Sequence, residues 1–273
     1  GEEAMRQYIA DAFAEELFTG NPAAVLPCKQ MPEAALMQSV AIENNYSETA
    51  FVVKTGSGTY DLRWFTPSGE IDLCGHATLA SAYVVSEFVE PGVSEMRFQT
   101  LSGELRAMRE GDWITLDFPV GKTRPVPVTE AMLAATDGLA REAYFDGGDL
   151  VLTVGSEEEL ARFVPNDGLI LKLDGLRDGL GLILTAPSAE YDFVSRYFYP
   201  CSYPRAHVME DPVTGRAHTF LAPVWAKKLG KTRMTARQIS RRGGVVAVRL
   251  EGGRVFLGGK VVLFMEGEIP FDL

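Results

Sequence analysis

Five side chains in three short motifs could transfer protons or bind anions. The motifs are NNYSETAFVV with Glu48, DLCGHATLAS with Cys74 and His76, and MEDPVTGRAH with Asp211 and Arg216. Two carboxylates whose surroundings push their pKa values apart let a site use one as a proton donor and the other as a base or orienting group. The motifs therefore indicate acid–base chemistry, and the elements that hold them determine the role of each side chain.

Glu48 stands at the start of a strand-like run. Strand alternation places it on the same face as Ala50 and Val52. If that face is buried, desolvation raises the pKa of Glu48, which then carries a proton as a general acid near neutral pH. The alternative is a solvated glutamate at the edge of a strand.

His76 opens the run GHATLASAYVVSEF, which is small and apolar nearly all round and predicts a helix wrapped by other elements. The first turn of such a helix offers unpaired backbone N–H groups and the positive end of the dipole, which together bind anions. That field lowers the pKa of His76 and keeps the imidazole neutral. The alternative is a histidine that only caps the helix.

Asp211 precedes Pro212, so its backbone should be extended just before a second helix that begins near Gly215. The helix dipole favours the ionised form of Asp211. The alternative is a simple cap or turn residue.

The two helix starts resemble each other. Aligning TGRAHTFLA with CGHATLASA matches Gly215 to Gly75 and Ala217 to Ala77, about half the chain apart. The repeat predicts an internal duplication and an α+β fold of two similar domains, each a strand-rich, barrel-like wrap around one central helix. We expect the two helix N-termini to face a shared cleft.

Short strand-like runs ended by Gly, Pro or charged residues fill both halves, and the proline-rich segment 119–130 reads as a linker. The predicted domains are 5–118, joined by a returning strand at 261–273, and 126–260. The glycine pairs at 147–148, 243–244, 252–253 and 258–259 are interpreted as hairpin turns.

The formal charge of −11 argues against nucleic acid or an anionic membrane as a partner. The basic segment 227–242 is interpreted as a solvated helix end and turn, with a binding patch as the alternative. Three scattered cysteines without CxxC indicate neither a disulfide framework nor a zinc site and fit a reducing cytoplasm. No run is long and apolar enough for a membrane helix.

Five stretches of the sequence, in their order along the chain, resemble the PhzF-like isomerases of phenazine biosynthesis. They are DAFAEELFTGNPAAV, NNYSETAFV, LRWFTPSGEIDLCGHATLASAYVV, MEDPVTGRAHTFLAPVWAKKLGK and ARQISRRGG. The resemblance runs from Ala10 to the C-terminus and thins between about 120 and 205. It implies the diaminopimelate-epimerase-like fold, with two pseudo-symmetric halves that each surround a central helix.

The resemblance also implies isomerisation of a small anionic, carboxylate-bearing molecule by a homodimer. Glu48 would move a proton between two substrate carbons, while His76 and Asp211 would hold the substrate and set the electrostatics. The positions implied to bind substrate are Gly75, Ala77, Thr214, Gly215 and Arg216. We expect no metal, nicotinamide, flavin or pyridoxal cofactor, because there is no clustered ligand set and no nucleotide fingerprint.

Two other functions stay open. LCGHAT also resembles the first cysteine motif of proline racemases, which use one thiol on each half, but Thr214 stands where the second thiol would be, and a hydroxyl is a far weaker acid than a thiol. A non-catalytic ligand-binding protein is the third possibility. The family usually has TGSAH where this chain has TGRAH, so Arg216 could pair with a carboxylate of the substrate or fill the pocket, and either role indicates a substrate different from the phenazine precursor.

Overall fold

The structure, a computed structural model, describes residues 5–202 and 205–270. These residues form two compact units. Unit 1 runs to Phe118 and resumes at Leu257, and unit 2 is Pro119–Phe256. The division lies near the predicted boundaries, but the return to unit 1 begins before the predicted Val261, and residues 271–273 of that returning segment lie outside the described part.

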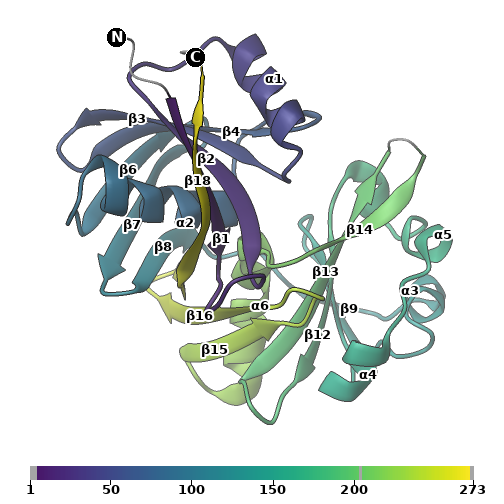
Figure 1. Ribbon diagram of the computed structural model, residues 1–273. Coiled ribbons are helices and arrows are strands. Elements are labelled where there is room, and N and C mark those ends of the chain that lie inside the picture. Colours follow the sequence, from purple (N-terminus) through teal and green to yellow (C-terminus); the bar gives the residue numbers. More distant parts are fainter. Residues whose placement is uncertain (1–4, 203–204, 271–273) are drawn as a thin grey trace. The chain divides into compact units, whose positions relative to one another are not determined.

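Unit 1 is a continuous wrap of strands in the order β18–β1–β2–β3–β4–β6–β7–β8, with the short β5 also paired to β4. Its strands are β1 (Met5–Ala12), β2 (Asn21–Cys28), β3 (Thr49–Gly56), β4 (Thr59–Thr66), β5 (Gly69–Ile71), β6 (Glu95–Thr100), β7 (Gly103–Glu110), β8 (Trp113–Pro119) and β18 (Val261–Ile269). The β2–β3 and β4–β6 pairs are parallel, and each is bridged by a helix. The late strand β18, yellow in Figure 1, lies beside the early strand β1, drawn in purple.

The two helices of unit 1 differ in burial. Helix α1 (Ala34–Asn44) packs one face, with Met37 and Ala41, against the sheet near Phe51. Helix α2 (Gly75–Val84) is buried nearly all round and continues into one π-helical turn, Val85–Val89. The small side chains of α2 let the surrounding strands approach closely, which explains the nearly all-apolar pattern of its sequence.

Unit 2 repeats this plan, with the strand order β9–β10–β11–β12–β13–β15–β16 and β14 paired to β13. Its strands are β9 (Pro125–Val126), β10 (Glu142–Tyr144), β11 (Leu150–Thr153), β12 (Leu182–Pro187), β13 (Phe193–Cys201), β14 (His207–Asp211), β15 (Arg233–Gln238), β16 (Gly244–Glu251) and β17 (Arg254–Gly259), the last of which crosses the unit boundary. Its helices are α3 (Glu130–Ala135), α4 (Glu157–Arg162), α5 (Asp167–Ile170), the 3-10 turn Leu176–Asp178 and α6 (Gly215–Leu229).

The central helix of unit 2 is α6, which is buried along most of its length. Pro223 within it has no N–H to donate to the carbonyl of Thr219. That carbonyl instead accepts a hydrogen bond from the backbone N–H of Gly121 at 3.0 Å. Trp225 stacks on Phe193, with ring centroids 5.4 Å apart, and anchors the helix to the sheet.

The predicted duplication is confirmed by matching topology and by a repeated ion pair. In both units a parallel strand pair flanks the central helix in the sequence, β4 with β6 and β13 with β15, and a short antiparallel strand precedes that helix. Arg63 on β4 forms two hydrogen bonds with Glu70 on β5, both 2.7 Å long. Arg196 on β13 makes the same two-pronged contact with Glu210 on β14, at 2.8 and 2.9 Å.

Three sequence interpretations need correction. Segment 227–242 is more than a helix end and turn, because it contains β15, whose basic residues alternate with buried ones on the pleated strand. Gly258 and Gly259 lie inside β17 and do not form a turn; a Cβ at Gly259 would lie 2.5 Å from the Phe13 ring. The linker 119–130 already contains strand β9, and Thr129 caps α3.

Candidate active site

The first turn of α2 holds the functional residues of unit 1. Cys74 is the N-cap in an extended conformation, and no side chain caps the helix. Gly75 and His76 follow as the first helical residues, and Ala77 is fully buried behind them. The helix therefore presents its first backbone N–H groups without a capping side chain, an arrangement that favours a negative group.

Glu48 lies directly before β3, and its carboxylate reaches this helix start. Its Oε2 is 2.9 Å from Nε2 of His76, and both side chains are largely buried, 14% exposed for Glu48 and 6% for His76. The contact is short, but Oε2 has no hydrogen bond of acceptable geometry, so the pair is an ionic contact made off the direction of the ring N–H. A buried carboxylate oxygen without an aligned donor is unusual in a folded protein and marks a candidate functional atom.

Cys74 completes the cluster from the other side of the imidazole. Its Sγ is 3.4 Å from Nδ1 of His76, and the residue is 8% exposed. Burial raises the pKa of the Cys74 thiol, and the negative charge of Glu48 adds to that effect. Because burial disfavours the thiolate, Cys74 is a weaker candidate base than the carboxylate of Glu48.

The pKa shifts of Glu48 and His76 run opposite to the sequence-based expectation. Burial pushes the pKa of Glu48 upward, but the positive charge of His76 and the polar contacts with His76, Ser47 and Cys74 outweigh it and lower the pKa. Burial likewise opposes the charged form of His76, yet Cys74 and Glu48 raise its pKa well above the ordinary value. The prediction failed because it considered burial and the helix dipole separately, whereas each residue is the charge partner of the other.

The corresponding helix start in unit 2 is built from Asp211, Thr214 and Gly215. The hydroxyl of Thr214, the N-cap of α6, donates to Oδ2 of Asp211 at 2.5 Å. The amide of Gln238 braces the turn: its Oε1 accepts from Thr214 N at 2.8 Å and its Nε2 donates to the carbonyl of Asp211 at 2.9 Å. Gln238 was not predicted, although it lies fully buried at the end of β15.

Arg216 pairs with a carboxylate of the protein itself. Its Nε donates to Oδ2 of Asp149 at 3.0 Å, and its guanidinium lies 5.5 Å from the centre of the Phe220 ring. Asp149 is 1% exposed and also accepts from Tyr197 at 3.0 Å and from the backbone N–H of Gly181 at 2.9 Å. The side chain of Arg216 is 49% exposed.

His218, also in the first turn of α6, has no acidic partner. Its Nδ1 is 2.7 Å from the carbonyl of Thr214, and its buried Nε2 has no hydrogen-bond partner among the described residues. Burial lowers the pKa of His218 to about 4, so the ring is neutral at pH 7.

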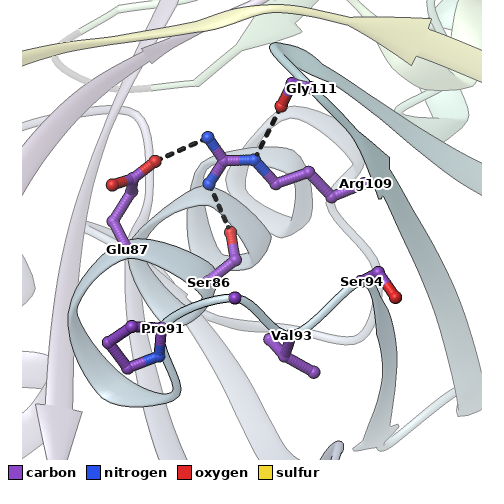
Figure 2. Close-up of a pocket in the computed structure, with 8 residues that line it drawn as sticks. Ser86, Glu87, Pro91, Val93, Ser94, Arg109 and Gly111 are labelled. Carbon is purple, nitrogen blue, oxygen red and sulfur yellow. Dashed lines mark hydrogen bonds and ion pairs between the residues drawn. The ribbon is translucent and has the colours of Figure 1, made fainter.

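A pocket of about 350 Å³ lies beside the π-helical turn of unit 1 (Figure 2). Arg109 lines it, but its guanidinium donates to Ser86 at 2.8 Å, to Glu87 at 2.5 Å and to the carbonyl of Gly111 at 3.0 Å. Since Glu87 already pairs with this charge, Arg109 is a structural brace of the turn.

No helix in the described ranges is long and apolar enough to cross a membrane.

The structure thus gathers Glu48, His76 and Cys74 in unit 1, and Asp211, Thr214, Gly215 and Arg216 in unit 2. That both groups serve one ligand stays a prediction.

Comparison with known proteins matches residues 10–267 to the family model described as phenazine biosynthesis-like protein. The chain belongs to the phenazine biosynthesis-like family. A Pseudomonas aeruginosa relative named as an uncharacterized isomerase is 44% identical over 259 residues, covering 95% of this chain and 96% of the relative. The mouse phenazine biosynthesis-like domain-containing protein 2 is 40% identical and covers 96% of this chain and 98% of its own length.

Solved structures of this family share the fold. The PhzF-family protein from Enterococcus faecalis has a TM-score of 0.90 at 41% identity, covering 98% of this chain and all of the other. A probable proline racemase from Agrobacterium radiobacter, at 11% identity, has a TM-score of 0.63 over 98% of this chain and 93% of its own. The second likeness shows a shared fold alone.

Proposed function

We propose that this phenazine biosynthesis-like protein is a cofactor-independent isomerase that moves a proton between two carbons of a small carboxylate. The observation that carries the proposal is the buried carboxylate of Glu48, which lies 2.9 Å from His76 and has one oxygen without an aligned donor. Relatives named as isomerases support the reaction class.

In the proposed reaction Glu48 begins as the carboxylate. Its oxygen accepts a proton from one substrate carbon, the electron pair of that C–H bond delocalises toward the substrate's unsaturated system, and Glu48 becomes a carboxylic acid. The same proton is then delivered to a second carbon, so atoms and charge balance without a co-reactant. His76 keeps Glu48 ionised between turnovers, since its positive charge offsets the desolvation of the carboxylate.

The substrate's anionic group would bind at the uncapped first turn of α2, around Gly75 and Ala77. For unit 2 we propose that Asp211, Thr214 and Gly215 orient the substrate and that Arg216 contacts an anionic group of it. The pairing of Arg216 with Asp149 supports this role because it fixes Nε of the guanidinium while 49% of the side chain stays exposed.

Hydrogen exchange in deuterated water tests the mechanism. A panel of small cyclic and unsaturated carboxylic acids, including dihydro-hydroxyanthranilic acid, is incubated with the protein, and deuterium at carbon is measured by NMR and mass spectrometry. We expect exchange with the wild-type protein, and a loss of at least roughly 10²–10⁴-fold in Glu48→Gln, which keeps size but cannot ionise. Cys74→Ser should retain exchange.

A racemase that uses Cys74 as its base is the second candidate, favoured only by the position of the thiol beside His76. It predicts the opposite pattern, with exchange abolished in Cys74→Ser and retained in Glu48→Gln. If the wild-type protein introduced deuterium into none of the acids in the panel, the result would count against both the isomerase and the racemase and would favour a binding protein.

A further inference from the structure

The cluster at the start of α2 has the composition of a metal site. Glu48, Cys74 and His76 each offer one ligand atom, and these atoms all lie within 4.8 Å of one another. Within 5–202 and 205–270, this is the group of His, Cys, Asp and Glu side chains whose geometry could hold a metal ion. Glu48 is distant from CGHA in the sequence, so no spacing motif reveals the cluster.

The donor set selects a particular class of cation. A thiolate, an imidazole nitrogen and a carboxylate oxygen are the ligands of Zn²⁺, whereas Mg²⁺ and Ca²⁺ prefer oxygen ligands alone. Tetrahedral Zn²⁺ with bonds of about 2.0–2.3 Å requires ligand atoms roughly 3.5 Å apart. Cys74 Sγ lies 3.4 Å from Nδ1 of His76 and Glu48 Oε2 lies 2.9 Å from Nε2, so the two side chains face different ring nitrogens. A single ion is held through one of these nitrogens, and the side chain that faces the other nitrogen must turn toward it.

Two further observations favour binding at this position. The Oε2 atom of Glu48 is buried without an aligned donor, so this oxygen has a lone pair free to coordinate a cation. Glu48 is also the most exposed of the three residues, with 14% of its side chain accessible. Three protein ligands leave a fourth position open, as in zinc sites that hold an exchangeable ligand.

We propose that Zn²⁺ binds to Glu48, Cys74 and His76, displaces the protons of the thiol and the imidazole, and blocks proton transfer at this site. The metal binding stands on the geometry alone, and the inhibition rests on the proposed function. Zn²⁺ is thus an inhibitory ligand of the cluster and no part of the isomerisation chemistry.

Cobalt titration tests the binding without any substrate. Co²⁺ replaces Zn²⁺ as a coloured probe, and thiolate ligation gives a near-ultraviolet charge-transfer band. We expect one Co²⁺ per chain in the wild-type protein, with that band present and bleached when Zn²⁺ is added. Cys74→Ser should lose the band, and Glu48→Gln should weaken Co²⁺ affinity by more than about tenfold, since even indirect supports of metal sites are worth about 10–100-fold.

The matched controls are Cys28→Ser and Cys201→Ser, which remove the other two thiols and should keep the band. Circular dichroism establishes that each variant is folded, and a Zn²⁺-induced rise in melting temperature gives a second readout. Absence of the band in the wild-type protein, or its survival in folded Cys74→Ser, would overturn the metal site. A bound metal that leaves exchange in deuterated water unaffected would overturn the inhibition while the binding stands.

Discussion

Each central helix carries one buried histidine near its start, and the two behave in opposite ways. His76 in α2 lies between Glu48 and Cys74, and its pKa is raised. His218 in α6 lies against the carbonyl of Thr214 and the Phe193 ring, and burial lowers its pKa to about 4. The same residue type on equivalent helices is therefore charged in one unit and neutral in the other. Its neighbours determine the charge, and they make the first histidine a candidate for chemistry and the second part of the core.

Of the substitutions considered, replacing His76 should have the largest effect on turnover, and replacing His218 is the matched comparison. In His76→Asn the carboxylate of Glu48 loses the charge that keeps it ionised, desolvation raises its pKa, and turnover at neutral pH falls at least about 100-fold. Because the base must be ionised, the acid limb of the pH–rate profile should move to higher pH. His218→Asn should leave that limb in place. The rate of deuterium exchange as a function of pH measures the acid limb in both variants. If the limb moved in His218→Asn and not in His76→Asn, His218 would be the histidine that controls the ionisation of the base.

The neutral state of His218 should make unit 2 sensitive to acid. Between pH 6.5 and about 4 the unfolded chain takes up a proton on this residue that the folded protein does not, so stability falls as pH drops through that range. The expected loss is about 3 kcal/mol, from a pKa difference of roughly 2.5 units. Urea unfolding at pH 7 and pH 4.5 should show a smaller acid loss in His218→Leu than in the wild-type protein. His207→Asn is the control and should retain the full loss.

The buried acids of the two units also differ, and their stabilities should reflect it. Asp149 accepts three hydrogen bonds, from Arg216, Tyr197 and Gly181, so Asp149→Asn should destabilise the protein by about 2 kcal/mol. Glu48→Gln should destabilise it less, because Oε2 of Glu48 has no aligned donor to lose. Denaturant midpoints of the two variants decide this. A larger loss in Glu48→Gln would mean that Glu48 is primarily structural.

The smallest effect is expected at Arg216. Arg216→Gln should raise KM for an anionic substrate by about tenfold while kcat changes little, because the guanidinium contacts a group that does not react. Arg216→Lys keeps the charge but not the planar fork and should recover only part of the affinity. Steady-state kinetics on a substrate found in the exchange panel measures both variants. A fall in kcat with KM unchanged would instead place Arg216 in the chemical step.

Local pattern was sufficient to predict both central helices, their glycine starts and their duplication. It did not predict β2, because Pro22 and Pro27 make NPAAVLPC a poor strand sequence, yet pairing with β1 and β3 on both sides holds it extended. β15 was obscured by its exposed Arg and Thr residues.

The candidate site shows the same limit. From the sequence, Glu48, His76 and Asp211 were predicted as candidate site residues. The predicted direction of the pKa shift was wrong for Glu48 and His76, because a charge contact between distant segments has no local signal. Asp149 and Gln238 went unpredicted for the same reason: each acts only through partners that the fold brings to it.

Strand β18 has a consequence for the order in which the protein is made. It pairs with β1 from Met5 to Ala12, yet it is translated after every segment of unit 2. During synthesis on the ribosome, the strands and central helix of unit 2 are therefore complete before β18 is made, and until then β1 lacks this pairing partner. The unit that holds Glu48, Cys74 and His76 completes its wrap last, so an unfinished chain cannot assemble the intact strand wrap around the proposed catalytic cluster.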